Sequence, residues 1–171
     1  MRRLLATSDS ALLLLLRLTL AVVFFAHGAQ KALGWFGGAG FSATMAGFTG
    51  DLHLPAALAA LAIAAELLGA VALCAGFLAR FAALALACNM AVAIATVHAR
   101  AGFFMNWQGR LPAGSEGCEF HLLALALLVT IVARGAGALS VDGRLTRTRE
   151  LAVTLPREEV LMVSFPIARS H

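Results

Sequence analysis

Ionisable side chains recur inside segments that are otherwise strongly apolar. His27 and Lys31 lie one helical turn apart near the end of the run 12–31, and Glu66 lies near the middle of a second run. A lysine or histidine beside a buried carboxyl group can move a proton and can donate a hydrogen bond to a carbonyl oxygen. These residue types therefore indicate a site for acid–base work, or for binding the carbonyl group of a quinone.

Three further polar residues fall at related depths in the later apolar runs. Asn89 lies near the middle of the third run, whereas His98 and Glu119 lie toward the outer half. A charge that faces lipid costs about 2.5–3.5 kcal/mol at the centre of a helix, so these side chains are expected to face one another. We therefore predict a polar pocket in the outer half of a helical bundle, with the candidate residues His27, Lys31, Glu66, Asn89, His98 and Glu119.

A purely structural interpretation of several of these residues stays open. Glu66 can be a protonated carboxyl group that hydrogen-bonds to a neighbouring helix, and Asn89 can simply hold two helices together. Lys31 and His98 lie where long side chains reach the membrane interface. His121 lies about 200° around the helix from Glu119, so only one of the two can face the pocket, and we favour Glu119.

No metal site is predicted, because no pair of histidines or acids has a ligand spacing within one helix. The cysteines, Cys74, Cys88 and Cys118, form no CxxC pair. The sequence also shows no haem, flavin or nicotinamide motif. We therefore expect no intrinsic cofactor, a quinone as the candidate ligand, and electron transfer only through a partner chain.

The elements that must position these residues are four apolar segments. The chain has 171 residues, of which 61% are hydrophobic and 13% charged, against about 25% charged residues in soluble domains. The segments 11–33, 55–78, 80–100 and 117–138 are each long enough to cross about 30 Å. We predict an all-α integral membrane four-helix bundle over residues 1–143, with a cytoplasmic tail over residues 144–171.

Both connections on the outer side and the tail carry further expectations. In the loop 34–54, Phe41, Met45 and Phe48 follow a helical spacing, which predicts a short interfacial helix. In the second outer loop, the aromatic residues of 101–116 anchor the chain at the interface or form a lid over the pocket. In the tail, 151–155 and 160–163 are expected to form short strands or to dock on a partner.

Basic residues predict the orientation. Arg2, Arg3, Arg80 and the arginines of the tail fall on one side, whereas Lys31 and few others fall on the opposite side. This asymmetry places both termini in the cytoplasm. No basic stripe with interleaved aromatic residues is present, so a nucleic-acid partner is not expected. The expected partners are the lipid bilayer and another protein of a membrane complex.

Several short motifs resemble the DoxX family of small four-helix bacterial membrane proteins. They are His27-Gly28-x-x-Lys31, Glu66-x-x-Gly69, Arg80, Met90-x-x-Ala93, His98 with Gly102-Phe103, Glu119-Phe120 and Gly135-x-Gly137-x-x-Ser140-x-Asp142. The resemblance covers residues 12–143. One departure is Ala70, where the family often has a second glycine. The resemblance implies a protein of the bacterial cytoplasmic (inner) membrane that is often linked to redox complexes, such as a thiosulfate:quinone oxidoreductase.

Three functions follow as expectations. The first is a membrane subunit of a redox assembly with a quinone- or small-molecule-binding pocket, which is enzymatic only as part of a quinone-linked oxidoreductase complex. The second is a non-catalytic scaffold or assembly factor. The third is a small transporter; transporters usually contain inverted repeats, which are not evident here, although a homodimer would supply that symmetry.

Overall fold

The computed structural model describes residues 5, 7–110, 112 and 115–154, and in these residues all regular secondary structure is helical. Three helices are long and apolar enough to cross a membrane: α2 (Ala11–Leu33), α4 (Ala56–Ala75) and α5 (Ala79–Thr96). The remaining helices are α3 (Gly40–Gly50), α6 (Glu119–Arg134) and α7 (Val141–Thr154), with 3₁₀ turns at Trp35–Gly37 and His98–Ala101. The predicted all-α class is confirmed.

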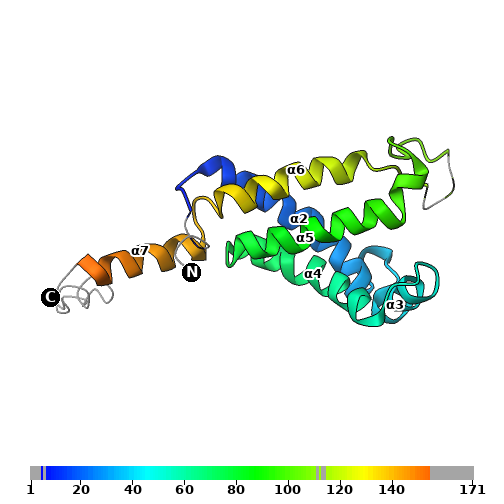
Figure 1. Ribbon diagram of the computed structural model, residues 1–171, viewed down its shortest axis with the longest axis horizontal. Coiled ribbons are helices and arrows are strands. Elements are labelled where there is room, and N and C mark those ends of the chain that lie inside the picture. The colour runs from blue at the N-terminus through cyan, green and yellow to red at the C-terminus, as the bar shows by residue number, and fades with distance from the viewer. Residues whose placement is uncertain (1–4, 6, 111, 113–114, 155–171) are drawn as a thin grey trace.

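The helices α2, α4, α5 and α6 run alongside one another, and α7 extends away from them (Figure 1). Helix α2 packs mainly against α4, and α5 packs against both α4 and α6. The start of α2 lies near α7, and α3 lies at the opposite end of the group (Figure 1). We refer to these two ends as the α7 end and the α3 end.

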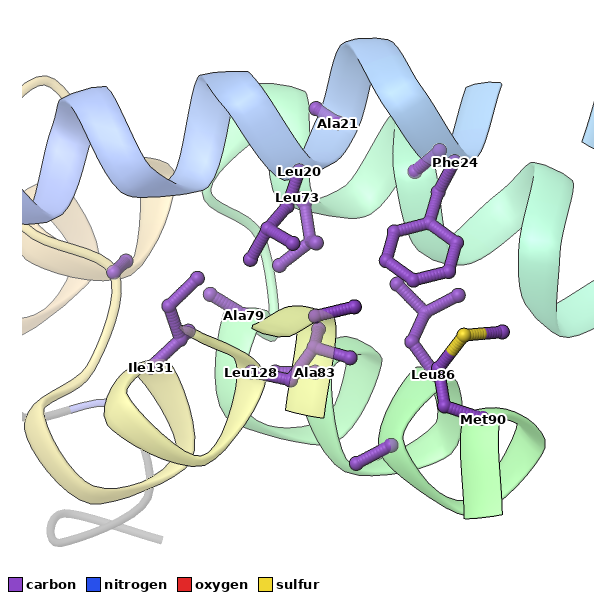
Figure 2. Close-up of a cluster of buried hydrophobic side chains, with 14 residues drawn as sticks. Leu20, Ala21, Phe24, Leu73, Ala79, Ala83, Leu86, Met90, Leu128 and Ile131 are labelled. Carbon is purple, nitrogen blue, oxygen red and sulfur yellow. The ribbon is translucent and has the colours of Figure 1, made fainter. Parts of the chain in front are cut away.

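An apolar core fills the space between the four helices. Figure 2 shows Leu20 and Phe24 of α2 pointing toward side chains of α4, α5 and α6. Small residues let the helix backbones approach closely. In lipid, helices associate through such close packing, because the hydrophobic effect does not favour helix contacts over lipid contacts. The buried core residues include Leu20, Phe24, Leu73, Ala79, Ala83, Leu86, Met90, Ala124, Leu128 and Ile131.

The fourth apolar segment forms a shorter helix than the range 117–138 predicts. Helix α6 has 16 residues, about 24 Å at 1.5 Å per residue. It ends at Gly135, whose φ of 90° leaves the helical region. Four membrane crossings therefore stay a prediction, whereas three helices of sufficient length are present in the described residues.

The tail begins as a helix rather than as strands. Residues 151–154 belong to α7, so the expected strand there is wrong, while Leu155 and the segment 160–163 lie outside the described residues. The Ser140 hydroxyl starts this helix by accepting a hydrogen bond from the Gly143 amide at 3.1 Å. From that start, arginine and leucine favour continued helix.

The α7 end is held together by a buried arginine. Arg17 of α2 is 1% exposed, and its guanidinium donates to the carbonyl oxygens of Leu73 at 2.5 Å and Cys74 at 2.6 Å. It also donates to the carbonyls of Ala138 and Leu139, both at 3.3 Å. Arg17 therefore caps the last turn of α4 and fixes the connection between α6 and α7.

Asp142 completes the same cluster from α7. Its carboxylate accepts from the amides of Leu78 at 2.8 Å and Ala79 at 2.9 Å, which are unpaired donors at the start of α5. In return, the Asp142 amide donates to the carbonyl of Gly76 at 3.0 Å. The hairpin between α4 and α5 is thus fixed by side chains from both ends of the chain.

Candidate functional site: a polar cavity between the helices

A cavity of about 560 Å³ lies between α2, α4, α5 and α6, toward the α3 end. Charged and imidazole groups line it together with aromatic and methionine side chains. The lining residues are Phe24, His27, Lys31, Glu66, Met90, His98, Met105, Trp107, Glu116, Phe120 and His121. A mostly apolar wall with a few convergent polar groups is the usual make-up of a site for a small organic molecule.

A partly buried ion pair forms the polar base of the cavity. The Lys31 ammonium of α2 lies 2.6 Å and 2.5 Å from the two carboxylate oxygens of Glu66 of α4. The Asn89 amide of α5 donates to the same carboxylate at 3.2 Å. Glu66 is 3% exposed, so its charge depends on these donors rather than on water. The structure thus brings three candidate residues from three helices to one point.

Two histidines stack on the opposite side of the pair. The rings of His98 and His121 have centroids 3.9 Å apart at 36°. The Nδ1 atom of His98 lies 2.6 Å from the carbonyl oxygen of Glu116, so this nitrogen must carry a proton and donate it. His121 is 7% exposed, and its Nδ1 is buried with no hydrogen-bond partner in the described part of the chain.

Glu119 does not line the cavity, contrary to our expectation that it, and not His121, would face inward. Its carboxylate accepts from the Met105 amide at 3.1 Å and from the Trp107 indole at 2.8 Å. The reason is that α6 begins at Glu119, so the side chain lies on the first turn, beside the preceding loop. His121, two residues further along the helix, faces the cavity instead.

The loop that Glu119 holds forms the wall of the cavity at the α3 end. We call residues 102–107 the cap segment. Its backbone carbonyls at Gly102, Phe103 and Phe104 accept from the amides of residues 118, 119 and 117, at 3.1, 2.9 and 3.1 Å. A Cβ atom at Gly117 would lie 2.5 Å from the Phe103 carbonyl, so this close approach requires glycine.

Replacing Glu119 by alanine is expected to loosen the cap segment. The change removes both acceptors, and hydrogen bonds to charged groups contribute about 1.5–3 kcal/mol. In a Trp35→Phe background, iodide should quench Trp107, which is already 75% exposed, up to about a third more strongly than without the Glu119 change. Glu119→Gln keeps two of the acceptor lone pairs and should show less than half of that increase. Equal quenching with and without Glu119→Ala would mean that the carboxylate does not hold the loop.

The distance between α2 and α4 is set by Gly28. A Cβ atom there would lie 2.7 Å from the Leu67 amide nitrogen and 2.9 Å from the Glu66 carbonyl carbon. Backbone atoms cannot move aside as a flexible side chain would, so any larger residue must push the helices apart. Gly28 therefore allows Lys31, one turn further along α2, to reach Glu66.

Gly28→Ala is expected to destabilise the protein by about 1–3 kcal/mol, the usual cost of overpacking. The matched control is Gly47→Ala in α3, where the nearest atom to a new Cβ is a side-chain oxygen at 3.6 Å. That helical substitution should be neutral or stabilising by up to about 1 kcal/mol. Thermal unfolding in detergent, followed by circular dichroism, measures both. A stabilising effect at both positions would contradict the close crossing.

The candidate residues thus divide into three groups. The cavity is lined by His27, Lys31, Glu66 and His98. Asn89 donates a hydrogen bond to the Glu66 carboxylate. Glu119 accepts a hydrogen bond from Trp107 of the cap segment. Sequence reasoning did not place Phe24 and Met90 at the site, because apolar residues inside a helix are usually core. In the described residues no three His, Cys, Asp or Glu side chains are grouped to hold a metal ion.

Apolar helices of membrane-spanning length around a polar cavity define a helical membrane protein. The comparison with protein families identifies this one: the DoxX family matches residues 12–99, just over half of the chain. The chain therefore belongs to the DoxX family. The matched region contains His27, Lys31, Glu66, Asn89 and His98 and ends before α6. No curated protein and no solved structure matches the chain.

Proposed function

We propose that this protein is a membrane subunit of a redox assembly and that its cavity binds the head group of a quinone. The observation that carries the proposal is the pairing of Lys31 with Glu66 in a cavity otherwise walled by Phe24, Met90 and Phe120. A quinone ring is flat and apolar, and its carbonyl oxygens need hydrogen-bond donors. The ammonium of Lys31 and the imidazole groups supply such donors.

The same residues can supply protons. Reduction of a quinone to a quinol takes up two electrons and two protons. Because His98 donates its Nδ1 proton to the Glu116 carbonyl, its Nε2 is the ring nitrogen that remains to exchange a proton with a ligand. Lys31 and Glu66 form a second acid–base pair in the same cavity. The electrons come from a partner chain, which is why we propose a subunit rather than a complete enzyme.

Quinone titration into the purified protein tests this proposal. We expect the wild type to bind a quinone and His121→Phe to bind it at least tenfold more weakly, because phenylalanine keeps the ring stacking but has no nitrogen. The matched control is His53→Phe, since His53 is exposed and lies outside the cavity lining. Wild-type protein that carries no quinone from the membrane and binds none on titration would refute the proposal.

We propose in addition that α6 is the fourth span and that the α7 end faces the bacterial cytoplasm. The start of α2 and helix α7 lie at the same end (Figure 1), as an even number of crossings requires. Arg80 of α5 reaches that end of α6, where it donates to the carbonyls of Val132 and Ala133. Labelling of single cysteines placed at either end in intact cells tests this orientation.

A non-catalytic scaffold is the second candidate, and one observation favours it. The contacts among Lys31, Glu66 and Asn89 join three helices, which is what a purely structural polar cluster would do. In that case, Glu66→Gln would lower thermal stability, and no cavity variant that stays folded would change quinone binding or the activity of an associated oxidoreductase.

A further inference from the structure

Toward the α3 end, the cavity is covered by the cap segment, in which Trp107 is 75% exposed. Met105 and Trp107 are part of its lining, and the Glu119 carboxylate holds both of these residues in place. Backbone hydrogen bonds pair the cap segment with residues 117–119 along most of its length. A molecule that approaches from the water on this side therefore meets a loop that hydrogen bonds hold in place.

The cavity is also closed toward the α7 end. Phe24 is 1% exposed and Met90 is 5% exposed, and Figure 2 shows both at one end of a packed core that runs on to Leu73 and Leu128. Beyond that core, the guanidinium of Arg17 fills the space at the end of α4. No route to the cavity passes through this end.

The side between α2 and α6 is different. These two helices contact each other only lightly, and they separate toward the α3 end (Figure 1). His27 of α2 and Phe120 of α6 both line the cavity, and their ring centroids are 6.3 Å apart. Phe120 is partly buried, whereas His27 is exposed. We call the place between these two side chains, on the side of α2 and α6, the side opening.

The exposure of His27 is informative because of its depth. It lies six residues before the end of α2 at Leu33, about 9 Å along the axis, and so within the apolar part of a spanning helix. An imidazole that faces acyl chains there is costly, and such groups normally face a cavity or a partner. Because His27 is exposed and also lines the cavity, we take it to mark the point where the cavity reaches the outer surface of the bundle.

We propose that the cavity is loaded sideways from the bilayer through the side opening, and that its ligand is an amphiphile with a single long apolar tail. The ring enters past His27 and Phe120, and the tail stays in the lipid between α2 and α6. This inference rests on the proposed quinone site and specifies which quinones it takes: those with tails, in preference to the bare ring.

Binding of two probes to the protein in lipid nanodiscs tests the proposal. The probes are decyl-benzoquinone and the same ring without its tail. We expect the tailed probe to bind the wild type at least tenfold more tightly. Phe120→Trp should narrow the opening and weaken binding of the tailed probe at least tenfold, while that of the bare ring changes less than threefold. The control is Leu122→Trp, at the same depth on the opposite, exposed face of α6.

A second measurement keeps the test valid if Phe120→Trp does not fold. Glu119→Ala should open the α3 end, so association of the bare ring from water should become at least fivefold faster, with the tailed probe unchanged. Equal affinities of both probes for the wild type would overturn sideways loading but leave the quinone site standing. A wild type that binds neither probe would refute both. A change from dimer to monomer in Phe120→Trp would show that a second copy covers the opening, which also overturns the proposal.

Discussion

Lys31→Met is expected to destabilise the protein by about 3 kcal/mol, since it leaves the buried carboxylate of Glu66 without its charged partner. The Lys31 side chain itself is 32% exposed, so the cost comes from the Glu66 side of the pair. Glu66 is 3% exposed, so water cannot replace the ammonium that now lies 2.5 Å from its carboxylate. The Asn89 amide would remain as a donor, but at 3.2 Å it supplies one neutral hydrogen bond. Chemical unfolding in detergent, with circular dichroism as the readout, measures the loss.

The double variant Lys31→Met/Glu66→Met separates the ion pair from simple packing. If the cost comes from the stranded carboxylate, removing it should restore at least half of the lost stability, because a neutral pair of similar volume is often tolerated. Such a result is a coupling energy of about 1.5 kcal/mol or more between the two sites. Arg100→Met serves as the control for loss of a positive charge at an exposed position. Additive effects of Lys31→Met and Glu66→Met would contradict the ion pair.

The sequence was sufficient to predict that Lys31 or His27 pairs with Glu66 or Glu119, but not which of these contacts forms. Apolar segment lengths give the three long helices nearly residue for residue, and counting along them puts Lys31, Glu66 and Asn89 in the middle and outer half of the bundle. Depth alone does not tell which faces meet. That depends on the close crossing at Gly28, where backbone approaches backbone, and no periodicity encodes the angle of such a crossing.

Glu119 and His121 show where the sequence was insufficient. Helical geometry correctly predicts that only one of them faces the cavity, but the choice depends on where α6 begins. The helix starts at Glu119, where the amides of residues 117–119 pair with the cap segment. Loop hydrogen bonds between residues 102–104 and 117–119 have no sequence signature, so the favoured residue was the wrong one.

For Arg17, at the other end of α2, the sequence likewise predicts the helix face but not the partners. Arg17 shares a helix face with His27 and Lys31, so turning that face inward is predictable. It is ten residues from His27, about 15 Å along the axis, and there it meets the end of α4 instead of the cavity. The carbonyls that receive it become available only because α4 stops at Ala75 and the chain turns at Gly76.

Arg17→Met is expected to cost about 3 kcal/mol or more, without loss of the cavity. The guanidinium satisfies four carbonyl oxygens, and leaving a buried polar group without a partner costs about 1–3 kcal/mol each. It also places a positive charge at the C-terminal end of α4, where the helix dipole favours one. Unfolding in detergent, measured as for Lys31, gives the size of the effect.

Two companion variants show whether hydrogen bonding or mere charge is responsible. Arg17→Lys keeps the charge but has one nitrogen, which cannot reach carbonyls in both the α4 and the 138–139 segments, so it should recover less than half of the loss. Arg134→Met removes an exposed arginine of α6 and should change stability by less than about 0.5 kcal/mol. Equal losses for Arg17→Met and Arg134→Met would show that the buried network contributes nothing special.

Replacing Lys31 and replacing Arg17 should also differ in their effect on ligand binding. Lys31 touches the cavity, so its replacement should weaken quinone binding as well as stability, whereas Arg17 lies behind the apolar core that separates it from the cavity. Folded Arg17→Met protein should therefore bind the tailed quinone within twofold of the wild-type affinity. A tenfold loss of binding in this variant would mean that the α7 end and the cavity are coupled through α2, and the division of this helix into a structural half and a binding half would be wrong.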